Sequence, residues 1–397
     1  MHELSTPAAH TVRTGAQRLV DDDFAAVAGE RVGVLSNHTA VLADLSHLVD
    51  VLAASDQVEL TAAFGAEHGF RGASQAERDE TSFTDTRTGL PVYNLYREPY
   101  QEQARIIASA GVDTIIFDIQ DVGVRFYTYI WSMYEAMLAA ALSGKRFVVL
   151  DRPNPIGGVR VAGPMMHLTQ EEDARAFFRQ VCLQHAMTVG ELAHYFNEVL
   201  LPARIGRCLD ALAVISMSGW EREMTFDQTG LGTWVLPSPN LPTLDTALVY
   251  PGTGLFEGTN LSEGRGTTRP FELIGAPFID HRWAELLNAQ DLAGVTFRDT
   301  YFKPTFADFK GQECQGVQLH ITDAAAFDAL QCAVAMMVTA RAIYPEFEMD
   351  RRLDRHSGSK QLRPSIAAGA GVEDITGQWQ DELEEFDAAR VQYLLYS

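Results

Sequence analysis

A glycine-rich segment at residues 251–277 (PGTGLFEGTNLSEGRGTTRPFELIGAP) holds the densest group of chemically capable side chains in the chain. Its candidate residues are Glu257, Asn260, Glu263, Arg265 and Arg269. Carboxyl groups can move protons, and guanidinium groups bind anions. The segment has too few apolar side chains for a buried element and too many glycines for a stable helix, while glycine lets a backbone approach a ligand closely. We therefore expect a loop that contributes to an active site, with a solvated surface loop as the alternative.

A second group lies at residues 64–72 (FGAEHGFRG), where Glu67, His68 and Arg71 stand between glycines after a short apolar run. Glutamate is a poor turn former, so its presence at this point suggests a chemical role. A general acid must hold its proton near neutral pH, and burial beside Phe64 and Phe70 favours that neutral form. The pattern predicts Glu67 as a general acid, with His68 next to it in the catalytic set. The alternative is a loop salt bridge between Glu67 and Arg71.

A third group, residues 117–129 (FDIQDVGVRFYTY), combines carboxylates with an arginine and several aromatic rings. Its candidates are Asp118, Asp121, Arg125, Tyr127 and Tyr129. A sugar ring has apolar C–H faces and polar edges, so aromatic faces beside carboxylates suit sugar recognition. The alternative places the aromatic residues in the core and makes Asp121 a helix cap.

These groups follow short apolar strands that alternate with amphipathic helices. We predict strands at 31–36, 58–64, 114–117, 147–150 and 212–216, and helices at 42–53, 101–110, 129–143 and 188–200. Thr188 and Glu191 form a capping box, so Glu191 is better explained as a helix-start residue than as a catalyst. Strands that are apolar on both faces predict a mostly parallel, Rossmann-like α/β sheet covered by helices. Because parallel strands end at one edge, the polar groups that follow them are expected to share one cleft.

Composition changes along the chain and predicts four parts. These are an N-terminal extension (1–30), a Rossmann-like domain (31–245), a glycine-rich active-site and interdomain segment (246–279) and a smaller C-terminal α+β auxiliary domain (280–397). In the last part we expect a helix at 283–288, strands at 295–301 and 316–321, a long helix at 324–344 and a polar tail.

Charge and motifs exclude several classes of function. The chain has 31 Lys and Arg against 53 Asp and Glu, a formal net charge of −22, which repels nucleic acids and anionic membranes. The glycines at 252–258 have the spacing G-x-G-x-x-x-G, and no Walker A or G-x-S-x-G sequence occurs, so we expect neither a nucleotide cofactor nor a serine triad. The four cysteines lack zinc-site spacing and there is no H-E-x-x-H, so no metal is expected.

Targeting signals are also missing from the sequence. No apolar run approaches the length of a membrane span, and the N-terminus lacks the apolar core of a signal peptide. The sequence as written therefore predicts a cytoplasmic protein. If a leader has been removed, the protein is secreted or periplasmic.

Several long motifs together resemble one family. They are FGAEHGFRG, TGLPVYNLY, FDIQDVGVRFYTYI, VLDRPNPIGG, MTVGEL, PSPNLPT and LVYPGTGLFEGTNLSEGRGTTRPFE, and they cover the chain from about residue 30 to its end. The sequence resembles the exo-β-N-acetylmuramidase (NamZ) family, formerly a domain of unknown function. The resemblance implies a Rossmann-like domain without a dinucleotide, an auxiliary domain, and a cleft between them. It also implies release of N-acetylmuramic acid from the non-reducing, β-1,4-linked ends of peptidoglycan fragments.

The resemblance also assigns roles to residues. The family's proposed catalytic glutamate lies in an E-H-G motif, which falls on Glu67; Ala66 stands where the family usually has proline, and many members carry a secretion signal that this chain lacks. N-acetylmuramic acid has a lactyl carboxylate that needs an arginine. The candidates for that arginine are Arg71, Arg125, Arg265 and Arg269, and further sugar-binding candidates are Asp121, Tyr127, Asn240 and Asn260.

The second catalytic group stays open, because glycosidases use two carboxyl groups or one with help from a substrate acetamido group. Asp118, Glu257 and Glu263 are all candidates for it. A non-catalytic muropeptide- or sugar-acid-binding protein would share the cleft and the arginines without needing a tuned carboxyl group. A metal-dependent hydrolase is a third possibility, distinguished by its sensitivity to EDTA.

Overall fold

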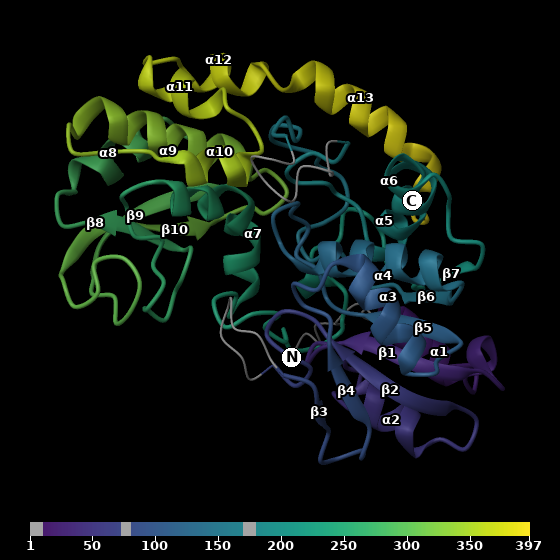
Figure 1. Ribbon diagram of the computed structural model, residues 1–397. Coiled ribbons are helices and arrows are strands. Elements are labelled where there is room, and N and C mark those ends of the chain that lie inside the picture. Colours follow the sequence, from purple (N-terminus) through teal and green to yellow (C-terminus); the bar gives the residue numbers. More distant parts are fainter. Residues whose placement is uncertain (1–10, 73–80, 170–179) are drawn as a thin grey trace, which may run out of the picture.

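The computed structural model describes residues 11–72, 81–169 and 180–397. The chain forms two halves that lie side by side (Figure 1). One half, here called the sheet half, contains the seven-stranded sheet and its helices, and the other, the C-terminal half, contains a three-stranded sheet and the last long helices. The first ten residues of the predicted N-terminal extension lie outside the described residues. Residues that follow them form helix α1 (Gly15–Asp21), which packs on the sheet half.

The large sheet confirms the predicted α/β class. Its predicted strands are β1 (Arg31–Ser36), β2 (Glu59–Gly65), β5 (Thr114–Asp118), β6 (Arg146–Leu150) and β7 (Leu212–Ile215). Two short strands not predicted, β3 (Phe83–Thr84) and β4 (Pro91–Asn94), extend one side and give the order β3-β4-β2-β1-β5-β6-β7. All neighbouring pairs are parallel except β3 with β4. β4 escaped prediction because it is short and begins with proline, which is uncommon inside sheets.

Helices cover both faces of the sheet because its strands are apolar on both. In β5, Ile115 and Phe117 belong to one core cluster, whereas Ile116 between them belongs to the other. Helices α1 and α2 (Leu48–Ala54) pack on the side of Ile116, and α3 (Tyr100–Ser109), α4 (Tyr129–Ser143) and α5 (Val189–Tyr195) pack on the opposite side (Figure 1). The alternation of side chains along a strand thus builds two separate cores.

The predicted capping box at the start of α5 is present. The Thr188 hydroxyl accepts from the amide of Glu191 at 3.2 Å, and the Glu191 carboxylate accepts from the amide of Thr188 at 3.0 Å. The helix predicted to reach residue 200 continues through a π-helical turn (Phe196–Leu200) into α6 (Leu201–Ile205). Glu191 also binds Arg222 at 2.6 Å, which confirms its structural role.

The C-terminal half begins with α7 (Leu244–Thr253) and contains an antiparallel sheet of order β8-β10-β9. Its strands are β8 (Leu273–Ala276), β9 (Val295–Phe302) and β10 (Cys314–Ile321), and its first helices are α8 (Arg282–Asn288) and α9 (Ala329–Ile343). The predicted polar tail is wrong, since it folds into α10 (Arg351–Ser357), α11 (Leu362–Ala367), α12 (Val372–Gly377) and α13 (Gln380–Arg390). Charged residues dominate α13, but its few apolar residues, Leu383 and Phe386, are buried.

The glycine-rich segment differs most from expectation. It is mostly buried, and its first part is helical, comprising the end of α7 and a 3-10 turn, η4 (Gly254–Gly258). Its glycines allow close contact with the protein itself: a Cβ at Gly252 would lie 1.9 Å from the Ala329 carbonyl oxygen, and one at Gly258 would lie 2.1 Å from the Leu353 amide nitrogen. The prediction of a ligand-facing loop is therefore wrong for this part, because backbone packing against α9 and α10 requires the glycines.

The chain end returns to the sheet half. Helix α13 passes over the top of the molecule and brings the C-terminus next to α5 and α6 (Figure 1). The Tyr396 hydroxyl donates to Asp151 Oδ2 at 2.5 Å, and the Leu395 amide donates to Glu191 Oε1 at 2.9 Å. Asp151 is fully buried at the end of β6 and also accepts from the Thr188 hydroxyl at 2.8 Å. The last residues thus join the two halves through a buried carboxyl group.

This junction predicts a pH-dependent stability. Burial raises the pKa of Asp151 to about 7, so the folded chain holds a proton that the unfolded chain releases near pH 4. Stability from the protonated group is complete below that lower pKa and is lost as the pH rises through about 7. In urea unfolding between pH 5 and 8, Asp151→Asn should flatten this decline by up to about 1.4 kcal/mol per pH unit. The exposed Asp210→Asn should retain it; equal slopes in both variants would contradict the assignment.

Candidate active site

Glu67 lies directly after β2, at the edge where the parallel strands end. Its side chain is buried, and two neutral hydroxyl groups hold its oxygens: the Tyr96 hydroxyl donates to Oε1 at 2.8 Å and the Thr128 hydroxyl donates to Oε2 at 2.6 Å. His68 follows with φ of 69°, a conformation that is uncommon outside glycine and that is associated with functional sites. Glu67 therefore has a defined orientation that its two hydroxyl partners set.

Arg71 contacts other carboxylates. Its guanidinium binds Asp50 at 2.8 Å and Asp85 at 2.7 Å. Hydrogen bonding from Arg71 lowers the pKa of Asp85 to about 2. The alternative salt bridge between Glu67 and Arg71 is thus replaced by a structural network around Arg71, and Arg71 is a poor candidate for binding substrate.

A ladder of aromatic rings runs from Glu67's neighbourhood into the C-terminal half. The ring of Tyr129 lies 6.5 Å from that of His68 and 5.0 Å from that of Tyr127. Tyr127 lies 5.9 Å from Tyr250, which lies 4.7 Å from Phe271. The four tyrosine and phenylalanine rings of this ladder are buried and pack edge to face, so they act as core at the junction of the two halves.

A triad of charged groups, Glu257, Glu263 and Arg265, lies at the far end of this ladder. Arg265 binds Glu257 at 2.7 Å and Glu263 at 2.9 Å, and its guanidinium lies 5.0 Å from the ring centre of Phe271. Burial raises the pKa of Glu263 to about 7, against the opposing charge of Arg265. Burial by itself would also raise the pKa of Glu257. The charges of Arg265 and His356 outweigh burial, so the pKa of Glu257 is lowered. Two carboxyl groups with separated pKa values can serve as an acid and an anion at neutral pH.

Two other predicted arginines have structural partners. Arg125 is buried and donates to the carbonyls of Pro164 and Val181, each at 2.8 Å, and to that of Ser357 at 2.6 Å. It therefore braces three chain segments from both halves. Arg269 is partly exposed and binds Glu272 at 3.1 Å.

The two aspartates after β5 have different environments. Asp118 is fully buried and paired with Arg152, whose Nε and Nη2 lie 2.5 Å and 2.9 Å from its two oxygens. Asp121 Oδ2 accepts from the Gly123 amide at 2.7 Å, but Asp121 Oδ1 is buried without a hydrogen-bond partner among the described residues. Asp118 is thus neutralised, whereas Asp121 keeps one bare oxygen.

The two asparagines predicted to bind the sugar have different environments. Asn260 joins two segments of the C-terminal half, donating to the Glu346 carbonyl at 2.7 Å and accepting from the Glu348 amide at 2.9 Å. Asn240 is half-buried inside the turn that the Leu241 amide closes on the Ser238 carbonyl at 3.0 Å. Asn260 is structural, and a role of Asn240 in sugar binding stays a prediction.

Sequence reasoning missed Tyr96, Thr128 and Arg97. Tyr96 and Thr128 both lie in motifs quoted above, but nothing in their spacing indicates that they meet at Glu67. Arg97 has φ of 64°, and its guanidinium carbon lies 5.2 Å from the ring centre of Tyr96. Burial and the charge of Glu67 raise the pKa of Tyr96, and Arg97 opposes that rise. The structure thus places an exposed arginine beside the hydroxyl that binds Glu67.

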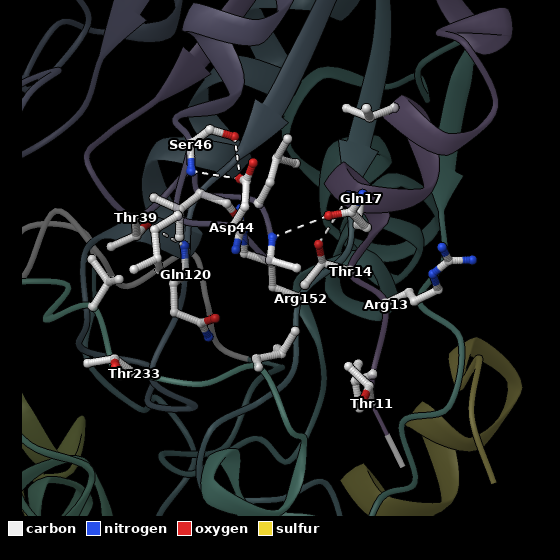
Figure 2. A pocket seen from close by; sticks show the side chains of 18 of the residues that line it. Thr11, Arg13, Thr14, Gln17, Thr39, Asp44, Ser46, Gln120, Arg152 and Thr233 are labelled. Carbon is white, nitrogen blue, oxygen red and sulfur yellow. Dashed lines mark hydrogen bonds between the residues drawn. The ribbon is translucent and has the colours of Figure 1, made fainter. Parts of the chain in front are cut away.

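A separate cavity of about 520 Å³ lies at the same edge of the sheet, between the N-terminal segment and residues 226–235. Figure 2 shows Gln120, Arg152, Thr14 and Gln17 among the residues that line it. Arg152 is occupied by Asp118, and the Gln120 amide donates to the carbonyls of Asp121 and Pro153, each at 2.8 Å. None of the predicted site residues lines this cavity, so the candidate active site is the neighbourhood of Glu67 instead.

Neither a metal site nor a membrane-spanning helix occurs among residues 11–72, 81–169 and 180–397. Within these ranges no three His, Cys, Asp or Glu side chains are grouped so that they could hold a metal ion. Within the same ranges none of the helices has the length and apolar character needed to cross a bilayer.

The role of Arg125 as a brace can be tested through stability. Arg125→Lys keeps the charge, but its three N–H groups share one nitrogen and cannot replace the separate Nη1 and Nη2 contacts, so buried acceptors lose their partners. We expect the free energy of unfolding in urea to fall by roughly 3 kcal/mol. The matched change at the partly exposed Arg269, Arg269→Lys, should cost less than about 1 kcal/mol. An Arg125→Lys protein as stable as the parent would contradict this role.

Comparison with known proteins gives one consistent result. Residues 32–245 match the family model for the N-terminal part of the exo-beta-N-acetylmuramidase NamZ, and residues 248–396 match the model for its C-terminal part. The peptidoglycan beta-N-acetylmuramidase NamZ of Bacillus subtilis (strain 168) is 43% identical over 390 residues, which cover 97% of this chain and 91% of that protein.

Two crystal structures of DUF1343 family proteins from Bacteroides fragilis NCTC 9343 share the fold. The first has a TM-score of 0.87 at 33% identity and covers 98% of this chain and 100% of its own. The second has a TM-score of 0.77 at 28% identity and covers 97% of this chain and 99% of its own. With both domain models matched along almost the whole length, the chain belongs to the NamZ family of exo-β-N-acetylmuramidases.

Proposed function

We propose that this protein is an exo-acting glycoside hydrolase that releases N-acetylmuramic acid from the non-reducing, β-1,4-linked end of peptidoglycan fragments, with Glu67 as general acid. Family membership supports the reaction. The observation that carries the role of Glu67 is its position: a buried carboxyl group at the carboxyl edge of the parallel sheet, held by two neutral hydroxyls. Ligands of α/β sheets bind at this edge.

The two hydroxyl partners suit a group that must change its protonation state. A hydroxyl can donate to a carboxylate or accept from a carboxylic acid, so Thr128 can stay in place whether or not Glu67 holds a proton. As acid, Glu67 protonates the oxygen of the leaving saccharide; as base, it then takes a proton from the attacking water.

Replacement of Glu67 tests this role. Glu67→Gln keeps the shape and the contacts to Tyr96 and Thr128 but removes the transferable proton. On a chromogenic β-N-acetylmuraminide, we expect turnover to fall roughly 10²–10⁴-fold with KM little changed. The exposed Glu59→Gln, at the start of the strand that precedes Glu67, is the control.

Three other outcomes would contradict the role of Glu67 or the proposed reaction. Turnover of Glu67→Gln within a few-fold of the parent would remove Glu67 from the mechanism. A parent protein that binds the substrate but never cleaves it would support a muropeptide-binding protein. Loss of parent activity in EDTA would support a metal-dependent hydrolase.

We further propose that Arg97 contributes to recognition of the lactyl carboxylate. A protein with net charge −22 needs a local cation for an anionic sugar. Arg97 is exposed and lies over Tyr96, the partner of Glu67, on a backbone conformation that costs energy for a residue other than glycine.

Selectivity for the muramyl sugar over N-acetylglucosamine measures this contribution. Loss of a charge-assisted pair with the lactyl group affects only the muramyl substrate. Arg97→Gln should therefore reduce the ratio of kcat/KM for the two chromogenic sugars by roughly 10²-fold. Arg105→Gln, an exposed change on α3, should leave the ratio unchanged. If Arg97→Gln lowers both substrates equally, Arg97 supports the fold of the site and does not read the lactyl group.

A further inference from the structure

Several buried polar atoms near Glu67 lack hydrogen-bond partners among the described residues, Ser36 Oγ and His38 Nδ1 among them, and three of these atoms have complementary chemistry. These three are Asn37 Nδ2, Asp121 Oδ1 and the Tyr127 hydroxyl, and their residues are at most 6% exposed. Leaving a buried donor or acceptor unpaired is costly, so native structures rarely do so without a reason. One acceptor and two donors in one place indicate a ligand that has complementary groups.

The sheet register brings these residues together with Glu67. Ser36, at the end of β1, pairs with Gly65 of β2 on one side and with Asp118 of β5 on the other. Asn37 therefore lies between the loop that carries Glu67 and the loop that carries Asp121.

The surroundings of Tyr129 also indicate that Asn37, Glu67 and Asp121 lie close together. Burial and the charges of Glu67 and Asp121 raise the pKa of Tyr129, and the neighbouring Tyr127 and Asn37 side chains oppose that rise, so all four residues act on one hydroxyl. The ring of Tyr127 lies 5.0 Å from that of Tyr129. The Tyr127 hydroxyl has Ser238 and Tyr129 as polar neighbours, and the Asn37 amide has Tyr129, but none of these pairs has the geometry of a hydrogen bond.

Asp121 is held so that only one of its oxygens remains available. Oδ2 accepts from the Gly123 amide at 2.7 Å and lies 3.3 Å from His185 Nε2, although that pair is not aligned as a hydrogen bond. His185 Nδ1 accepts from the Met187 amide at 3.2 Å, so the proton of a neutral imidazole is on Nε2 and faces Asp121. These contacts orient the carboxylate and leave Oδ1 for a ligand.

We propose that Asp121, Tyr127 and Asn37 bind the 2-acetamido group of the substrate and that Asp121 orients this group to act as the nucleophile. An acetamido group has one N–H donor, one carbonyl acceptor and a methyl group. Its N–H matches the acceptor Asp121 Oδ1, and its carbonyl oxygen matches the Tyr127 hydroxyl and the Asn37 amide, which are donors. Its methyl group matches the apolar rings of the aromatic ladder. The inference rests on the proposed glycosidase function and names its second catalytic group.

The other carboxyl groups fit this role less well. Asp118 is neutralised by Arg152 inside the sheet edge. Glu257 and Glu263 share Arg265 at the far end of the aromatic ladder, next to Phe271. Asp121 is thus the carboxylate near Glu67 that combines a fixed orientation with a bare oxygen.

The resulting reaction balances with water as its only co-reactant. The acetamido oxygen forms a bond to the anomeric carbon while the bond to the leaving oxygen breaks, and Glu67 gives its proton to that oxygen. The positive charge of the oxazolinium ring is shared by the N–H that faces Asp121. Water then adds to the anomeric carbon, its proton goes to Glu67, and the acetamido group is restored with net retention of configuration.

The experiment varies the acyl group of the substrate. Chromogenic β-muraminides with N-acetyl, N-difluoroacetyl and N-trifluoroacetyl groups differ in the nucleophilicity of the carbonyl oxygen. The proposal expects kcat/KM of the parent protein to fall with each added fluorine. It also expects the first product seen by NMR to be the β-anomer.

Two variants and a control connect this effect to the residues. Asp121→Asn should lower kcat for the N-acetyl substrate roughly 10²–10³-fold. Tyr127→Phe removes a hydroxyl that has no hydrogen-bond partner among the described residues, so it should lower kcat/KM about tenfold while leaving the melting temperature unchanged or higher. The exposed Asp113→Asn, which lies before β5 at the opposite edge, should match the parent.

The outcomes separate the two proposals. Hydrolysis of the N-acetyl substrate that is insensitive to fluorination, or a first product with inverted configuration, overturns the acetamido subsite and leaves the glycosidase function standing. A Tyr127→Phe protein with unchanged kinetics and a lower melting temperature shows a structural hydroxyl and also overturns the subsite. No hydrolysis of the N-acetyl substrate overturns both proposals.

Discussion

The candidate site depends on the parallel pairing of three strands. Because β1, β2 and β5 run in the same direction, their ends meet at one edge, and Ser36 pairs with both Gly65 and Asp118. The loops that carry Glu67 and Asp121 therefore begin on either side of the same residue. The strands are almost entirely buried from both faces, so the two cores hold this register, and a slip of one residue would exchange the side chains between them.

The second constraint is the junction between the two halves. A single core cluster includes residues from β5, α4, α7 and α9, and the aromatic ladder from Tyr129 to Phe271 lies within it. Arg125 and the chain end add polar links across the same junction. The glycines at 252 and 258 belong to this packing, since any side chain there would meet backbone atoms. Acidic groups of the C-terminal half are therefore held at a fixed place relative to Glu67.

Electrostatics separates the charged residues into two kinds. Three arginines are paired inside the protein: Arg71 and Arg152 form salt bridges with carboxylates, and Arg125 donates to backbone carbonyls. These contacts stabilise loops that follow strands. Glu67 instead accepts from the hydroxyls of Tyr96 and Thr128, and Asp121 accepts from the Gly123 amide. The proposed acid–base role of Glu67 needs a carboxyl group that can exchange its proton.

The sequence by itself determined the class of fold and predicted the edge at which the proposed site lies, because apolar periodicity defines strands and parallel strands bring their following residues to one edge. Five strands, the capping box at Thr188 and the position of Glu67 after β2 were predicted on that basis. Which charged side chains pair with one another was decided only by the tertiary structure. Asp50 and Asp85 meet Arg71 through folding over long sequence separations, and the buried glycine-rich segment packs against helices far along the chain. Such contacts have no local pattern, since they depend on which surfaces the whole fold brings together.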